Sequence, residues 1–179
     1  MNMKKMKLAI CSLCLAFLLP SLTHAYFTTD QSALKVNDHT ALYTITYKFG
    51  FEKRDLYMPI TAVRDLSVDS DEFKLGYSLV NNGGATTSVG RITALALTDD
   101  PDVTIKDNRY FVPAGSAATF TLVAIVDLDQ TEIDNHNLNL SLLVTNLPFL
   151  MVRKEDNLEI LAHLNPSELQ YYITPPVRF

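Results

Sequence analysis

The sequence has little of several features that mark particular protein classes. It contains two cysteines, no tryptophan and six glycines in 179 residues. Both cysteines, Cys11 and Cys14, lie in an apolar run near the start of the chain. If that run is removed, the remaining chain has no disulfide, no cysteine metal ligand and no cysteine nucleophile. Its stability must then come from the packing of its interior.

The first 25 residues have the three parts of a secretory signal peptide. Three lysines occur among the first seven residues, Leu8–Leu19 is apolar, and Ala25 supplies the small residue at the end. The apolar run is shorter than the about 20 residues that a membrane-spanning helix needs, so we expect cleavage after Ala25 rather than retention as an anchor. The sequence therefore predicts a periplasmic, secreted or cell-surface protein with a single domain over residues 26–179.

Positive charge is also scarce. The net charge of the whole chain is −5, and removal of the three leader lysines, with no acidic residue beside them, would make it −8. Because no basic cluster follows the leader, nucleic acids and anionic membrane surfaces are unlikely partners. The three histidines beyond the leader, His39, His136 and His163, form no metal-binding motif and accompany no Gly-x-Ser-x-Gly sequence. We therefore predict that the protein is not an enzyme.

What the sequence has in abundance is two-residue alternation. From Ala41 onward, apolar residues alternate with polar ones in short segments separated by turn residues, as in half-buried strands. A single helical turn is expected at Thr131–Asn137. The other segments predict strands at Ala41–Phe49, Phe73–Leu79, Arg91–Thr98, Val103–Ile105, Arg109–Val112, Ala118–Val126, Leu138–Val144, Leu158–Leu164 and Tyr171–Thr174. The fold class indicated is an all-β, Ig-like antiparallel sandwich of eight to ten short strands.

Leu56–Val63 also has an extended pattern, but Pro59 cannot donate a hydrogen bond to a neighbouring strand. It is therefore expected at a sheet edge or at a bulge. An exposed edge can pair with an extended segment of another protein. The residues expected to bind such a partner are Leu56, Tyr57, Ile60 and Arg64.

Two turn sequences carry a resemblance to a known family. Val80-Asn81-Asn82-Gly83 ends one strand, and Val112–Ser116 precedes the threonine-containing strand Ala118–Val126. In this arrangement, the stretch from Tyr77 to Val126 resembles bacterial extracellular Ig-like modules of the cell-adhesion-related kind. The resemblance implies an adhesive, scaffolding or accessory domain that binds a protein or a surface glycan.

Calcium is the one cofactor that the sequence offers ligands for, although no cofactor is required by the main interpretation. Acidic residues gather in three expected loops, Asp69–Glu72, Asp99–Asp102 and Asp127–Asp134. Calcium prefers several carboxylate or carbonyl oxygens that converge from a loop. The third loop departs from a calcium-binding EF-hand at its sixth and twelfth positions. The candidate ligands are Asp127, Asp129, Glu132 and Asp134.

Two further alternatives stay open. Some aromatic residues do not fit the alternation, and an exposed aromatic strip would suit stacking on sugar rings. These residues are Tyr57, Tyr110, Phe111, Tyr171 and Tyr172. The terminal Phe179 would also suit a small eight-stranded outer-membrane barrel, but Pro175 and Pro176 interrupt the last strand of such a barrel. The leading interpretation is an exported, non-catalytic binding or accessory domain, and calcium-dependent or carbohydrate binding is its alternative.

Overall fold

The structure is a computed structural model that describes residues 29–66, 70, 72–82, 84–135 and 137–179. Several sequence predictions lie outside these residues: the leader with its cleavage point, the acidic residues Asp69 and Asp71, Gly83 of the predicted turn, and His136. Among the described residues, no helix is both long and apolar enough to cross a membrane.

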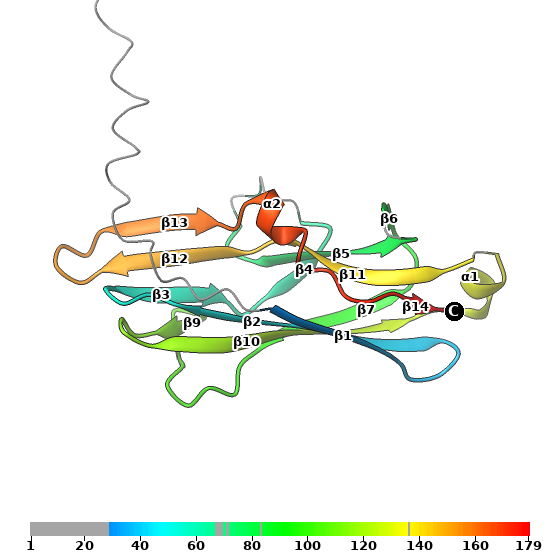
Figure 1. The fold of residues 1–179 in the computed structure, drawn as a ribbon, viewed down its shortest axis with the longest axis horizontal. Coiled ribbons are helices and arrows are strands. Elements are labelled where there is room, and N and C mark those ends of the chain that lie inside the picture. Colours follow the sequence, from blue (N-terminus) through cyan, green and yellow to red (C-terminus); the bar gives the residue numbers. More distant parts are fainter. Residues whose placement is uncertain (1–28, 67–69, 71, 83, 136) are drawn as a thin grey trace, which may run out of the picture.

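The strands form two layers that run along the length of the molecule (Figure 1). The first layer, sheet A, is antiparallel with the order β1-β2-β10-β7. Its strands are β1 (Thr29–Lys35), β2 (Thr40–Gly50), β10 (Ala117–Asp127) and β7 (Arg91–Leu97).

The second layer consists of two sheets, and the chain passes directly from one sheet into the other at Leu147 (Figure 1). Sheet B has the order β13-β12-β3-β9-β8, and sheet C has the order β14-β11-β5-β4 with β6 paired to β5. The strands of sheet B are β13 (Glu159–His163), β12 (Pro148–Arg153), β3 (Arg54–Pro59), β9 (Arg109–Val112) and β8 (Thr104–Lys106). The strands of sheet C are β14 (Val177–Arg178), β11 (Asn139–Asn146), β5 (Leu75–Asn81), β4 (Ala62–Arg64) and β6 (Ala85–Thr87). Two short helices complete the fold, α1 (Gln130–Asn135) and α2 (Pro166–Leu169).

One hydrophobic core lies between the layers, and aromatic rings from both layers meet there. Tyr47 of sheet A packs against Phe120 of the same sheet and against Tyr172, with ring centroids 5.8 and 6.2 Å apart. Phe49 of sheet A contacts Phe149 of sheet B at 5.5 Å. The rings of β2 and β10 reach this core because every second side chain of these strands points inward and is buried. The predicted all-β antiparallel sandwich is thus confirmed, and it is Ig-like in the broad sense of two antiparallel layers across one core.

The structure differs from the predicted strand list in two ways. It has fourteen strands within the described residues. The short strands β4, β6 and β14 carry too few residues to show a period. The predicted list also missed β1 and β12, and the first four residues of β12 are all buried, so this strand shows no alternation. At the C-terminus, Ile173 forms only a single bridge to Leu143, and regular pairing with β11 resumes beyond the two prolines at Val177–Arg178.

The prediction that Leu56–Val63 is one strand, at a sheet edge or with a bulge at Pro59, is wrong. Pro59 ends β3, and the chain then crosses to sheet C, where Ala62–Arg64 forms β4. β3 lies inside sheet B, paired with β12 on one side and β9 on the other. Of these two strands only β4 lies at a sheet edge, and it pairs with β5 in the parallel sense.

Candidate functional site

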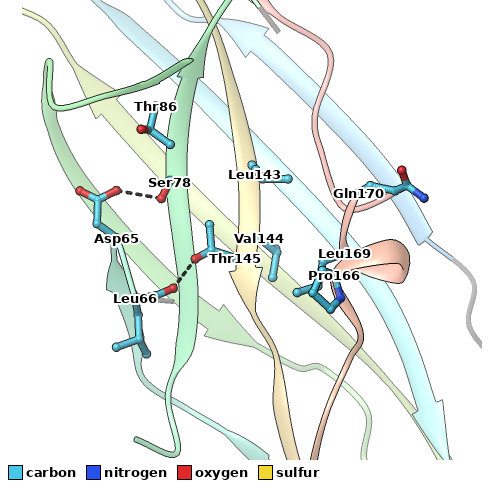
Figure 2. A pocket seen from close by; sticks show the side chains of 10 residues that line it. All are labelled: Asp65, Leu66, Ser78, Thr86, Leu143, Val144, Thr145, Pro166, Leu169 and Gln170. Atoms are coloured by element: carbon cyan, nitrogen blue, oxygen red, sulfur yellow. Dashed lines mark hydrogen bonds between the residues drawn. The ribbon is translucent and has the colours of Figure 1, made fainter. Parts of the chain in front are cut away.

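A pocket of about 550 Å³ opens on the outer face of sheet C, beside helix α2 (Figure 2). This volume lies in the range of about 300–1,000 Å³ that is usual for small-molecule sites. Strands β5 and β11 form its floor, with Ser78 on one strand and Leu143, Val144 and Thr145 on the other. The floor of the site is therefore formed by the two longest strands of sheet C.

A β-bulge in β11 shapes this floor. The register between β11 and β5 shifts between Val144 and Asn146, so Thr145 is an extra residue on its strand. A bulge of this kind locally redirects a side chain. The Thr145 hydroxyl donates a hydrogen bond to the carbonyl oxygen of Leu66, at 2.5 Å, and holds that residue at the pocket wall (Figure 2).

The position of Leu66 at the pocket wall also requires a glycine, Gly76, at the adjacent point of β5. A Cβ atom at Gly76 would lie 2.5 Å from the carbonyl oxygen of Leu66 and 2.9 Å from the Thr145 hydroxyl. Such distances are too short for any side chain, so the chain after β4 can cross β5 this closely only over a glycine. Gly76 and Thr145 together fix one side of the pocket.

The polar end of the pocket is formed by Asp65, Ser78 and Thr86 (Figure 2). Asp65 has a φ of 58°, a left-handed conformation that aspartate tolerates better than most residues. Its Oδ1 accepts a hydrogen bond from the Ser78 hydroxyl at 2.8 Å, and its Oδ2 lies 3.5 Å from Nε of Arg64. The Asp65 side chain is 55% exposed, so a carboxylate with remaining acceptor capacity faces the opening.

Helix α2 supplies the opposite, mostly apolar wall. Pro166 begins the helix, and the carboxylate of Glu168 accepts a hydrogen bond from the backbone N–H of Asn165 at 2.8 Å, which closes the first turn. Leu169 is 5% exposed and anchors the helix against the core. Pro166, Leu169 and Gln170 all line the pocket. The pocket thus combines an apolar wall at α2 with an acidic end at Asp65.

The residues predicted to bind a partner do not lie together on an exposed edge. Leu56 is fully buried in the core, and Tyr57 is half-buried on the outer face of sheet B, 5.2 Å from the ring of Phe111. Ile60 is half-buried in the crossing between β3 and β4. Pro59 does not mark an edge strand that would bring the four residues together, because it ends β3 inside sheet B.

Arg64 holds two segments of the protein together. Its guanidinium donates hydrogen bonds to the carbonyl oxygens of Thr87, Val89 and Gly90, at 2.8 to 3.0 Å. These bonds tie β4 to the chain between β6 and β7. Arg64 therefore serves the pocket indirectly, by fixing the position of its neighbour Asp65.

The candidate calcium ligands do not form a metal-binding group. In the part of the chain that the structure describes, no three side chains of His, Cys, Asp or Glu are placed to hold a metal ion together. The side chains concerned accept hydrogen bonds within the protein instead. Asp127 accepts from the hydroxyl of Thr40, and Asp134 accepts from the amide of Gln130, each at 2.8 Å.

Asp129 and Glu132 form the cap of helix α1. The backbone N–H of Glu132 donates to Oδ1 of Asp129 at 2.8 Å, and the backbone N–H of Asp129 donates to Oε2 of Glu132 at 3.0 Å. This is a reciprocal capping box. Oε1 of Glu132 also accepts the backbone N–H of Gly90 at 2.8 Å, which attaches α1 to the start of β7. The predicted helical turn is present as α1, and Asp129 is its cap.

The five aromatic residues that do not fit the two-residue alternation do not form one exposed strip. Tyr110 and Tyr172 are buried in the core, and Tyr171 is 67% exposed beside α2. Tyr57 and Phe111 are cross-strand neighbours in sheet B, and Nζ of Lys106 lies 3.1 Å from the centre of the Phe111 ring. The half-buried pair of Tyr57 and Phe111 is the part of this set that could still meet a sugar ring.

His163 lies in β13 with its Nδ1 atom 2.9 Å from Oδ1 of Asn146, a fully buried side chain. The amide of Asn146 also donates to the carbonyl oxygen of Lys74. These contacts join sheet B to sheet C, and they give His163 a structural partner.

Sequence reasoning did not find the pocket. Asp65, Ser78 and Thr145 come from three separate segments that only the crossing after β4 and the bulge in β11 bring together. A partial signal was present at Asn165-Pro166, where a capping residue precedes proline, and Glu168 completes a helix start. That signal predicts α2 but not the hollow beside it.

No protein-family model matches the chain, and no curated protein matches it. Among solved structures, it is similar to a crystal structure of the yeast GGA1 GAE domain-P21, with 10% sequence identity and a TM-score of 0.29. The similarity covers 80% of this chain and 95% of that chain.

Proposed function

We propose that the protein is an exported, non-catalytic binding domain of the periplasm or cell surface, and that its binding site is the pocket beside α2. The observation that carries this proposal is the pocket itself, which has an apolar wall, a polar end and a size suited to a small molecule. The signal sequence supports export, and the adhesion-related resemblance supports an accessory role in the envelope.

The lining indicates the class of ligand. Leu66, Leu143, Pro166 and Leu169 offer apolar contacts, whereas Asp65 is the charged residue in the lining. A carboxylate accepts hydrogen bonds most strongly from a charged donor. A ligand with an apolar body and an ammonium group at one end fits this distribution, and a carboxylate-bearing ligand would be repelled.

The test compares two probes of equal length and opposite charge. Isothermal titration calorimetry with octylamine and with octanoate, at neutral pH, should show binding of octylamine only. Asp65→Asn should weaken octylamine binding about tenfold, which is one charge-assisted hydrogen bond. Asp102→Asn, at an exposed turn residue, is the matched control and should leave binding unchanged. Equal affinity for the two probes, or binding that survives Asp65→Asn, would refute this assignment.

A further inference from the structure

Two arginines lie directly opposite each other at the end of sheet B that points away from sheet C (Figure 1). Arg54 is the first residue of β3, and its partner in the register is Arg153, the last residue of β12. The backbone N–H of Arg153 donates to the carbonyl oxygen of Leu158, on the side of β13. Arg153 and Arg54 therefore form a non-hydrogen-bonded pair, in which the side chains of an antiparallel ladder lie closest. Like charges in this position destabilise a sheet.

Both arginine side chains leave sheet B on the side of the hydrophobic core. Arg54 comes two residues before Leu56, and Arg153 comes two residues after Met151. Leu56 and Met151 are buried in the core, and alternate residues of a strand share a face. The two arginines are half-buried at the end of this core. Water therefore screens the repulsion between their charges less than it would on an open surface.

Arg153 has an acidic partner, whereas Arg54 has none. Nε of Arg153 donates to Oδ1 of Asp156 at 2.8 Å, and its Nη2 donates to Oδ2 of the same carboxylate. Arg54 forms no hydrogen bond and no ion pair with the residues that the structure describes, and its Nη1 atom is buried. A buried charged donor without an acceptor is costly, and such a group calls for a specific explanation.

The carboxylate that follows Arg54 in the sequence cannot serve as its acceptor. Asp55 lies on the opposite face of sheet B, because neighbouring residues of a strand point to opposite faces. There its Oδ1 accepts the backbone N–H of Ala114 at 2.8 Å and lies 3.5 Å from Nζ of Lys154.

The other acidic residues of this end limit the size of a possible ligand. Glu52 and Glu155 are exposed in the two adjoining turns, and neither forms an ion pair with Arg54. Residues 52–55 and 153–156 together carry four basic and four acidic side chains, so their net charge is zero. An extended anionic surface therefore gains no net attraction here, whereas a small anion can contact the arginines alone.

We propose that Arg54 and Arg153 bind a small, soluble phosphate monoester. A guanidinium presents its donors in one plane and pairs with two oxygens of a phosphate at once. At neutral pH a phosphate monoester carries close to two negative charges and three acceptor oxygens. It would accept from the unpaired donors of Arg54 and from Nη1 of Arg153, and its charge would offset the repulsion between them. This site is separate from the pocket beside α2.

The first experiment is isothermal titration calorimetry of the full chain with inorganic phosphate at pH 7.5, at an ionic strength kept constant with sodium chloride. The wild-type protein should bind phosphate at one saturable site. Arg54→Gln should weaken binding at least tenfold, because one bidentate contact is lost. Arg54→Lys should also weaken it, since lysine keeps the charge but not the planar fork. Arg178→Gln, at an exposed position on β14, is the matched control and should bind as the wild type does.

Thermal unfolding supplies a second readout. Arg54→Met keeps the aliphatic stem and removes the charge, so in chloride buffer it should raise the melting temperature by about 2–4 °C. Phosphate should raise the melting temperature of the wild type but not that of Arg54→Met. A lower melting temperature for Arg54→Met in chloride would show that Arg54 already has a stabilising partner, and it would overturn the proposal. So would phosphate binding that survives Arg54→Gln, or a wild type that phosphate does not stabilise up to about 50 mM.

A vesicle experiment separates a soluble ligand from a lipid headgroup. Phosphatidic acid presents the same phosphate monoester on a membrane surface. Flotation with phosphatidylcholine vesicles, with and without phosphatidic acid, should leave the wild-type protein unbound in both cases. Recovery that requires both phosphatidic acid and Arg54 would overturn the assignment to a small soluble ligand.

Discussion

The outer faces of sheets A and C show how similar strands produce different surfaces. β2 and β10 of sheet A pair in unbroken register over eleven residues, so their outer side chains form one regular surface. On sheet C the register of β11 is broken by a bulge, and the outer face is flanked by the chain after β4 and by helix α2. Regular alternation therefore gives an even surface, and its local interruption gives a hollow.

Alkaline pH should destabilise the whole fold, and with it the outer faces of sheets A and C, because both sheets share one hydrophobic core. This is the largest effect expected. Burial raises the pKa of Tyr43 and Tyr47, and it raises the pKa of Tyr172 to about 12. Each tyrosine stays protonated in the folded state but ionises near pH 10 when unfolded. Below pH 10 their contribution to stability is complete, and above it the free energy of unfolding should fall by about 1.4 kcal/mol per pH unit for each tyrosine.

The measurement is urea unfolding between pH 8 and about pH 11.5, with tyrosine ionisation followed by its absorbance. For Tyr172 the loss should continue to the upper end of this range, because its folded-state pKa is about 12. A free energy of unfolding that stays constant to pH 11 would contradict the burial of these hydroxyl groups.

Gly76→Ala should disrupt the pocket on sheet C and leave the outer face of sheet A unchanged. The added Cβ would meet the carbonyl oxygen of Leu66 at 2.5 Å, so the chain after β4 must move away from β5. Overpacking of this kind costs about 1–3 kcal/mol. The free energy of unfolding should fall by that amount, and octylamine binding should be lost. Gly84→Ala is the matched control, because a Cβ there has nothing within 4 Å.

Glu132→Ala should loosen the junction between α1 and sheet A. It removes half of the capping box and the acceptor for the N–H of Gly90, for a cost of about 1–2 kcal/mol measured by thermal unfolding. Glu159→Ala, at an exposed position on β13, should change stability by less than about 0.5 kcal/mol. A chelator should not reproduce the effect of Glu132→Ala, and if it does, the acidic loop binds calcium after all.

Two tyrosine-to-phenylalanine variants compare the contributions of two buried hydroxyl groups in the core, those of Tyr43 and Tyr172. The Tyr43 hydroxyl donates to the carbonyl oxygen of Leu140 at 2.9 Å, so Tyr43→Phe should cost about 1 kcal/mol. The Tyr172 hydroxyl is buried and has no hydrogen-bond partner among the residues that the structure describes. Tyr172→Phe should therefore leave the free energy of unfolding unchanged or raise it slightly. A larger loss for Tyr172→Phe than for Tyr43→Phe would show that its hydroxyl has a partner.

The sequence predicted what depends on period and turn chemistry. Alternation located the long strands β2 and β10, and each of the two turn sequences singled out contains a residue of positive φ, Asn82 in the first and Gly115 in the second. It did not predict the pocket, because a bulge at Thr145 and a close approach at Gly76 leave no periodic trace. It also misassigned Pro59, since proline is compatible with the end of an internal strand as well as with an edge.

The central claim is that the hollow face of sheet C binds an ammonium-bearing ligand while the outer face of sheet A does not. NMR spectra of the ¹⁵N-labelled protein, recorded during titration with octylamine, test it most directly. The account predicts that the amide signals of Asp65, Ser78, Thr145 and Leu169 move together with one affinity. Shifts centred on Leu95 and Ile125 instead, or no saturable shift at all, would contradict it.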